Sequence, residues 1–229
     1  MDTRTLARIA GLAGLATVIG GTVVEVLFPV PVEPGGTAEA ILRAGSQPGV
    51  FGTVTLLAAT TGIGTALLLV FAAALARCLD PEYGLLAQLA VLGAFGGFLL
   101  SILRRGLTIA FVQVAGNADP GGAVALYVAA GDSLVRVYAF PIILQMGSLG
   151  ILIISRRILP GWTGWAALGL ATAMVVGSFV AGIDPTADFG FPVYIGILVW
   201  TAVVSVILLA RPARSSPADL SERAPSTVS

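Results

Sequence analysis

The sequence contains no histidine, no lysine and a single cysteine, Cys78. Without histidine, the chain alone cannot build a histidine-ligated haem, a histidine-containing zinc site or a histidine-based catalytic dyad. One cysteine can form neither an internal disulfide nor a thiolate metal cluster. We therefore expect no cofactor, no metal site and no enzymatic activity, because no pair of residues has the spacing of an acid–base pair.

Charge is also scarce, since only 10% of the residues are charged, whereas a soluble domain has about 25%. Hydrophobic residues make up 57% of the chain, and the mean hydropathy is +0.98. This composition indicates that lipid is the solvent and that membrane lipids are partners. Twelve arginines balance 12 acidic residues, so the net charge gives no reason to expect nucleic acid as a partner.

Six apolar runs follow one another along the chain, each near the length of about 20 residues that spans a bilayer as a helix. They cover residues 6–28, 50–76, 84–103, 134–154, 162–182 and 191–210. We predict an all-α, polytopic integral membrane protein with a six-helix transmembrane domain over residues 1–210. Residues 211–229 are polar and rich in serine and proline, which predicts a disordered cytoplasmic tail.

The first run could also be read as a secretory signal peptide, because it follows Arg4 and Arg8. A signal-peptide core has about 7–15 apolar residues and ends at a small-x-small cleavage site. Here the run is longer, and the nearest such site, at residues 38–40, comes too late. We therefore predict a retained first helix.

The arginines predict the orientation. With the N-terminus in the cytoplasm, eight arginines lie on the inner side and four on the outer side. Six helices then place both the N-terminus and the C-terminus in the cytoplasm.

Two short segments carry a family resemblance. They are RIAGL at residues 8–12 and LPGWTGW at residues 159–165, the latter preceded by Ser155-Arg156. Together with the hydropathy layout over residues 6–210, they resemble a bacterial six-helix membrane family, domain of unknown function 4386. The resemblance implies a multi-pass protein of the bacterial plasma membrane, and it brings no catalytic residues.

Several local signals predict where helices begin and end. Arg104 and Arg105 interrupt the apolar residues of the third run after Leu103, and apolar residues resume through Val114. Asp suits the N-cap and Pro suits the first helical position, so three Asp-Pro pairs could each start a helix after a loop, and turn formation alone would also account for all three. The pairs are Asp80-Pro81, Asp119-Pro120 and Asp184-Pro185. In the long segment before the second run, Thr37 is expected to cap a short helix that extends through Arg43.

Small residues recur every four positions in the third run, at Gly93, Gly97 and Ser101, and Arg105 follows at the same spacing. Such a stripe lets another helix approach closely, which predicts packing inside the bundle or a homo-oligomer. Arg104 lies about 30 Å along this helix from its start at a rise of 1.5 Å per residue. Both arginines should therefore lie near the outer membrane boundary.

Further charged residues fall at the same predicted level as this arginine pair. Glu25, Arg104, Arg105, Asp132 and Arg136 could meet in one outer-leaflet cluster. Charges at membrane depth are costly unless they are paired or hydrated, so they are candidates for function. One interpretation is a site for a small anionic ligand, which guanidinium groups bind well. The structural alternatives are a Glu–Arg lock between helices and arginines that extend to the headgroups.

A second polar face lies in the fourth run, where Tyr138, Pro141, Gln145 and Ser148 share one side of a helix. The threonines of the second run, Thr53, Thr60, Thr61 and Thr65, are expected to supply its partners. This face could line a cavity, or Gln145 could form a hydrogen bond that holds two helices together.

Two hypotheses for function remain open. The first is small-ligand binding or transport through the outer polar cluster, and the alternative is a structural or regulatory component that acts by helix–helix assembly. An enzyme is disfavoured. The segment GDSL at residues 131–134 resembles an esterase nucleophile block, but the chain has no histidine or lysine to act as its base.

Overall fold

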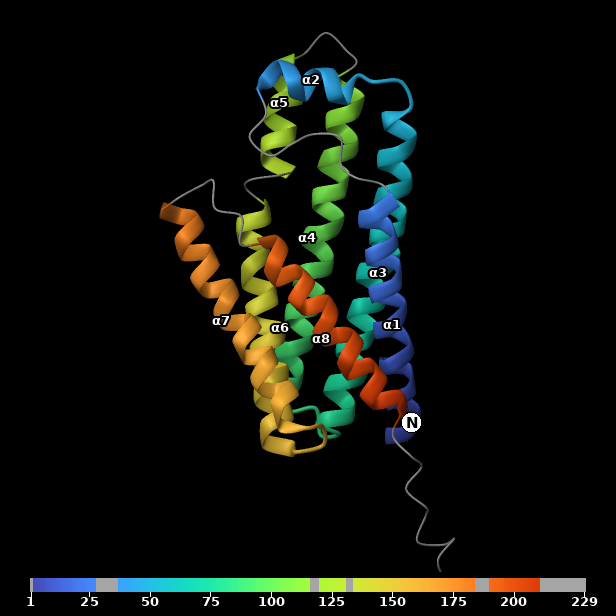
Figure 1. Cartoon of the computed structure of the whole chain (residues 1–229), viewed down its shortest axis with the longest axis vertical. Coiled ribbons are helices and arrows are strands. Elements are labelled where there is room, and N and C mark those ends of the chain that lie inside the picture. Colours follow the sequence, from blue (N-terminus) through green and yellow to red (C-terminus); the bar gives the residue numbers. More distant parts are fainter. Residues whose placement is uncertain (1, 28–36, 116–119, 131–133, 184–189, 211–229) are drawn as a thin grey trace, which may run out of the picture.

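The chain is all-helical in the parts that a computed structural model describes (Figure 1). These parts are residues 2–27, 37–115, 120–130, 134–183 and 190–210, with side chains except at 21–27, 134–136, 181–183 and 190–191. The helices are α1 (Thr3–Leu27), α2 (Ala38–Gly45), α3 (Val50–Leu79), α4 (Leu85–Ala115), α5 (Pro120–Val128), α6 (Leu134–Arg156), α7 (Gly161–Ile183) and α8 (Gly190–Ala210).

Six long helices form a closed ring. Going round the ring, α1 packs against α3, α3 against α4, α4 against α6, α6 against α7, α7 against α8, and α8 against α1. Figure 1 shows the start of α1 and the α3–α4 and α6–α7 connections at one end of the bundle, here called the N-terminal end. The short helices α2 and α5 lie at the opposite end, here called the α2 end.

Five of these helices are long and apolar enough to cross a membrane. The candidate spans are Val50–Leu79, Leu85–Ala115, Val137–Arg156, Gly161–Val180 and Pro192–Ala210. They correspond to the second to sixth apolar runs of the sequence. The first run corresponds to α1, whose side chains are described only as far as residue 20.

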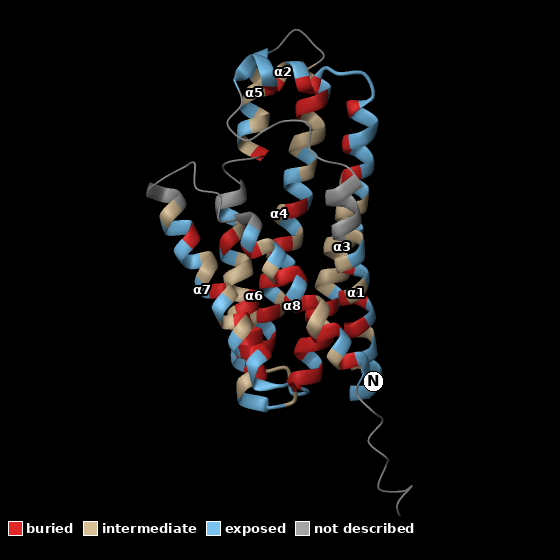
Figure 2. Cartoon of the chain, in the orientation of Figure 1, coloured by how far each residue is buried: buried red, intermediate tan, exposed pale blue. Residues whose placement is uncertain are grey.

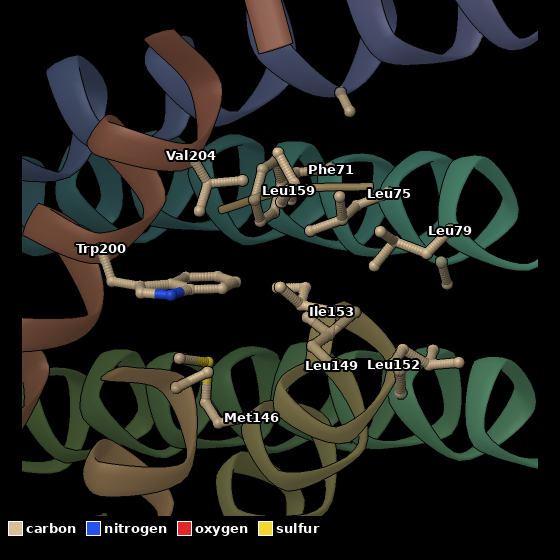
Figure 3. Close-up of a cluster of buried hydrophobic side chains, with 14 of the residues drawn as sticks. Phe71, Leu75, Leu79, Met146, Leu149, Leu152, Ile153, Leu159, Trp200 and Val204 are labelled. Atoms are coloured by element: carbon tan, nitrogen blue, oxygen red, sulfur yellow. The ribbon is translucent and has the colours of Figure 1, made fainter. Parts of the chain in front are cut away.

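The main hydrophobic core lies toward the N-terminal end, where buried residues are dense (Figure 2). Its largest fully buried side chains come from α3, α6 and α8 (Figure 3), namely Phe71, Leu75, Leu79, Met146, Leu149, Ile153 and Val204. In a membrane the outer faces of these helices contact lipid, so close packing rather than exclusion of water holds the ring together.

Trp200 joins three helices within this core. It lies on α8, its ring meets that of Phe71 on α3 edge-to-face at 6.1 Å, and its Nε1–H donates to the Thr163 carbonyl of α7 at 2.8 Å. A buried indole N–H needs such a partner.

Replacing Trp200 with phenylalanine should keep most of the ring contact but remove the donor. We expect this to lower the free energy of unfolding by about 1 kcal/mol and the Tm in detergent by about 2–4 °C. Trp165→Phe is the matched control, because Trp165 is 66% exposed and should change the Tm little. An equal loss in both variants would contradict the assignment.

A second, smaller core lies at the α2 end. It joins α2, the first turns of α3, the last turns of α4, and α5 through Ile41, Val50, Val54, Phe111, Val112 and Ala123. The predicted short helix is confirmed, because the Thr37 side chain accepts a hydrogen bond from the Ala40 N–H at 3.3 Å.

At two places the helices differ from the apolar runs or from the expected starts. Arg104 and Arg105 interrupt the apolar run but lie within the helix, as the four-residue spacing implies, because α4 is one helix of 31 residues from Leu85 to Ala115. Arginine is a good helix former, so a break in hydropathy need not break the helix. Asp80-Pro81 does not start a helix, since Asp80 is the C-cap of α3.

The other two Asp-Pro predictions have different outcomes. α5 begins at Pro120, as the sequence predicts. The pair Asp184-Pro185 lies outside the described residues.

Candidate functional site

A cavity lies inside the helical ring, and it is here called the polar cavity after the hydroxyl and amide groups that interrupt its mostly apolar wall. It has a volume of about 90 Å³ and is lined by residues of α1, α3, α4, α6 and α8. Eight of its lining residues can form hydrogen bonds through their side chains, namely Thr17, Thr60, Thr61, Thr65, Tyr138, Gln145, Tyr194 and Thr201. None of the described lining residues is charged. Since about 10–15 Å³ suffices for one water molecule, the cavity has room for several waters or one small molecule.

Helix α3 supplies three of these threonines within two turns. Thr60 donates to the Leu56 carbonyl at 2.9 Å, and Thr65 donates to the Thr61 carbonyl at 3.0 Å, so both hydroxyls are satisfied by their own helix. Thr61 differs, because its buried Oγ1 has no hydrogen-bond partner in the described part of the chain. Each threonine still presents an oxygen that can accept a further hydrogen bond.

Gln145 is the most polar group at this depth. It is only 7% exposed, lines the cavity, and makes no side-chain hydrogen bond within the described ranges. Gln145 precedes Arg156, the last residue of α6, by 11 positions, which is about 17 Å along the helix. That distance places it near the midplane of a hydrocarbon core about 30 Å thick. An amide at this depth is stabilised by a hydrogen-bond partner, and a polar molecule in the cavity could supply one.

The glycine stripe of α4 faces α6 of the same chain. A Cβ at Gly93 would lie 2.6 Å from both the backbone nitrogen of Gln145 and the backbone carbonyl oxygen of Pro141, so the two backbones touch there. At Gly97 the nearest atom would be the Tyr138 hydroxyl oxygen at 3.6 Å, an ordinary contact. Gly93 thus sets the closest approach of the two helices, and Gly97 borders the cavity.

The arginine pair lies beyond the cavity, toward the α2 end. Arg104 is exposed and Arg105 is half-buried. Tyr138, which lines the cavity, is close enough to interact electrostatically with both. Ser101, one turn before Arg105, is only 8% exposed.

The rest of the predicted outer cluster is not described at side-chain level. Asp132 lies outside the described residues, and the side chains of Glu25 and Arg136 are outside them as well. The meeting of these three groups with the arginines therefore stays a prediction.

The sequence analysis missed an ion pair at the N-terminal end. Asp80 Oδ1 accepts from Arg156 Nη2 at 2.7 Å, and Asp80 Oδ2 accepts from the Gly84 N–H at 2.8 Å. The Asp80 side chain is 5% exposed, whereas that of Arg156 is 49% exposed. One carboxylate therefore ties the end of α3 to the start of α4 and the end of α6. Both residues lie in connections predicted on the same membrane side, which is the one sequence signal for the pair.

No group of three His, Cys, Asp or Glu residues that could hold a metal is found among the described side chains. The polar side chains of the described cavity lining are hydroxyl and amide groups, set in a mostly apolar wall, which suits an uncharged polar molecule better than a metal ion or an anion. In comparisons with known proteins, no protein-family model, no curated protein and no solved structure matches this chain.

Proposed function

We propose that this chain is a six-span membrane protein that binds or transports a small, uncharged, polar molecule in the cavity inside its ring. The observation that carries the proposal is a cavity at membrane depth lined by the Gln145 amide and seven hydroxyl-bearing side chains, among which the buried Thr61 Oγ1 has no hydrogen-bond partner in the described part of the chain. Hydrogen-bonding groups at membrane depth are stabilised only when they are satisfied. A ligand rich in hydroxyl or amide groups would satisfy them.

The sixth span in this proposal is α1. It packs along α3 and α8 as a member of the ring and contributes Thr17 to the cavity. Thr17 Oγ1 donates to the Ala13 carbonyl of its own helix at 2.9 Å and also approaches the Gly64 carbonyl of α3 at 3.3 Å. A helix that completes both the ring and the cavity lining is best placed within the membrane.

The distribution of arginines supports a cytoplasmic N-terminal end. Arg4, Arg8, Arg77, Arg156 and Arg157 all lie near the start of α1 or at the ends of α3 and α6. An excess of arginine on one side favours that side as cytoplasmic. With both termini there, a bacterial plasma membrane and a relationship to domain of unknown function 4386 are part of the same proposal.

The assembly hypothesis has less support. This hypothesis rests on the stripe of small residues through Gly93 and Gly97. In the structure, α6 of the same chain packs on the face that carries these residues. A homo-oligomer would have to use another surface of α4.

The first experiment measures whether water reaches the cavity. In a Cys78→Ala background, Thr61→Cys places a thiol at the cavity wall, and Gly169→Cys places one on the exposed face of α7. We expect a small, charged methanethiosulfonate to react with reconstituted Thr61→Cys at least about tenfold faster than with Gly169→Cys, because thiolate reaction needs water. Glu82→Cys, in an exposed turn, is the positive control. Labelling of Glu82→Cys without labelling of Thr61→Cys would show that the cavity is dry and overturn the proposal.

The second part of the test identifies the ligand class. Glycerol and urea should slow the labelling of Thr61→Cys, whereas acetate of equal concentration should not, because the described lining has no cation to bind it. Adding Gln145→Leu should abolish the protection while leaving the Tm nearly unchanged, since the two side chains are close in volume. If glycerol and urea still protect Thr61→Cys when Gln145→Leu is present, the Gln145 amide does not take part in binding.

A further inference from the structure

A groove lies between α3 and α4 at the level of the arginine pair. It has a volume of about 220 Å³ and is lined on α3 by Ala58 and Gly62 and on α4 by residues from Ser101 to Ile109, among them Ile102, Arg105 and Gly106. It is separate from the polar cavity, since the two share no lining residue.

Small residues make the groove hollow. A Cβ added at Gly62 or at Gly106 would meet nothing within 4 Å, so neither helix fills the space between them. Ile102, which lines the groove, is 47% exposed, and the next residue, Leu103, is 50% exposed. In a membrane these side chains face the acyl chains, so the groove opens to lipid and has an apolar wall.

Two polar groups are placed in this otherwise apolar groove. Ser101 is 92% buried, being only 8% exposed, and its hydroxyl makes no hydrogen bond within the described part of the chain. Arg105 is half-buried at the same wall, one turn further along α4. A hydroxyl donor beside a guanidinium group matches the oxygens of a phosphate.

The depth of Arg105 agrees with a headgroup position. It follows Leu85, the first residue of α4, by 20 positions, or about 30 Å along the helix, which is about the thickness of the hydrocarbon core. With the N-terminal end at one membrane face, Arg105 reaches the headgroups of the opposite leaflet. The groove below its guanidinium would then lie among the acyl chains of that leaflet.

We propose that this groove binds one anionic phospholipid of the leaflet at the α2 end. Arg105 and Ser101 hold the phosphate, and an acyl chain occupies the hollow beside Gly62 and Ala58. The occupant is a lipid rather than a free anion because the groove joins a polar end to an apolar wall that is open to the membrane. The proposal does not depend on what the polar cavity binds.

Native mass spectrometry of the full chain tests the proposal. The protein is incubated in detergent with equimolar phosphatidylglycerol and phosphatidylethanolamine, and the lipid retained per protein is counted. We expect one phosphatidylglycerol to be retained with a preference of about tenfold or more over phosphatidylethanolamine. Arg105→Gln should abolish this preference because it removes the charge. Gly62→Leu should reduce retention of the lipid while every charge is kept, since leucine fills the groove.

The controls separate a built site from general attraction to arginine. Arg8→Gln removes an exposed arginine at the N-terminal end, and Gly169→Leu adds the same side chain to an exposed, open position. Both should retain the preference, and all variants are compared by Tm to confirm folding. The proposal would be overturned if the preference for phosphatidylglycerol survived in both single variants, Arg105→Gln and Gly62→Leu. It would also be overturned if Arg8→Gln reduced the preference as much as Arg105→Gln does. Stabilisation of the lipid-free protein by inorganic phosphate as strong as that by phosphatidylglycerol would overturn the lipid assignment.

Discussion

Replacing Gly93 with leucine is expected to force α4 away from α6 and to lower the free energy of unfolding by about 3 kcal/mol or more. The reason is that even the first added carbon would lie 2.6 Å from the backbone nitrogen of Gln145 and from the backbone carbonyl oxygen of Pro141. These are backbone atoms of a helix, so they cannot rotate away as the tip of a side chain can. Thermal unfolding in detergent should show a Tm lower by about 6–12 °C, or no folded protein.

Two matched controls make this prediction sharp. Gly169→Leu puts the same side chain at an exposed position of α7 where an added carbon meets nothing within 4 Å, so the Tm should change little. Alanine substitutions at Gly93 and Gly97 test whether the change in stability has opposite signs at the two positions. Gly97→Ala should be neutral or stabilising because alanine favours a helix over glycine by about 1 kcal/mol, whereas Gly93→Ala should be destabilising. Equal effects at Gly93 and Gly97 would show that the stripe packs as a unit and that the contact at Gly93 is not special.

The difference between these two glycines marks a limit of sequence analysis. A four-residue spacing predicts which residues share a face of the helix, and the structure places Gly93 and Gly97 toward the same helix, α6. The spacing does not contain the angle at which α6 crosses. That angle brings the two backbones together at Gly93 and separates them at Gly97, and it follows from packing around the whole ring.

The elements were predicted well where local chemistry decides them. Long apolar runs match the five candidate spans, and a threonine followed by a short amphipathic segment matches α2. The polar face through Tyr138 and Gln145 and the threonines of the second run were also recognised, and three of those threonines line the cavity. From the sequence, this polar face could either line a cavity or pack against another helix. The sequence of one helix does not give its distance from the neighbouring helices, so the two alternatives stayed open.

The elements were predicted poorly where a residue depends on distant parts of the chain. The sequence supports a turn at Asp80, and a turn is present, but its carboxylate serves Arg156, which lies 76 positions away. The four-residue spacing placed the arginines on the third predicted helix, but the apolar run ended at Leu103 and did not show that the helix continues to Ala115. The second core at the α2 end supports the last turns of the helix, since Phe111 and Val112 pack there.

Replacing Asp80 with alanine is expected to loosen the N-terminal end of the ring and to lower the free energy of unfolding by about 2–3 kcal/mol. The substitution removes two hydrogen bonds at once, the 2.7 Å bond from Arg156 and the 2.8 Å bond from the Gly84 N–H. The loss stays below that of a fully buried pair because Arg156 is half exposed and water can solvate it. Chemical unfolding in detergent measures this change, and Glu82→Gln, an exposed acidic residue in the same turn, should have almost no effect.

A double-mutant cycle with Arg156→Gln separates the ion pair from the cap. Asp80→Asn keeps an oxygen for the Gly84 N–H but removes the negative charge, so it should cost less than Asp80→Ala, and its coupling to Arg156→Gln should be about 1 kcal/mol. Additive losses would mean that the 2.7 Å contact contributes no net stability and that the cap at Gly84 carries the effect. If the coupling is present, Asp80 holds α3, α4 and α6 together at this end.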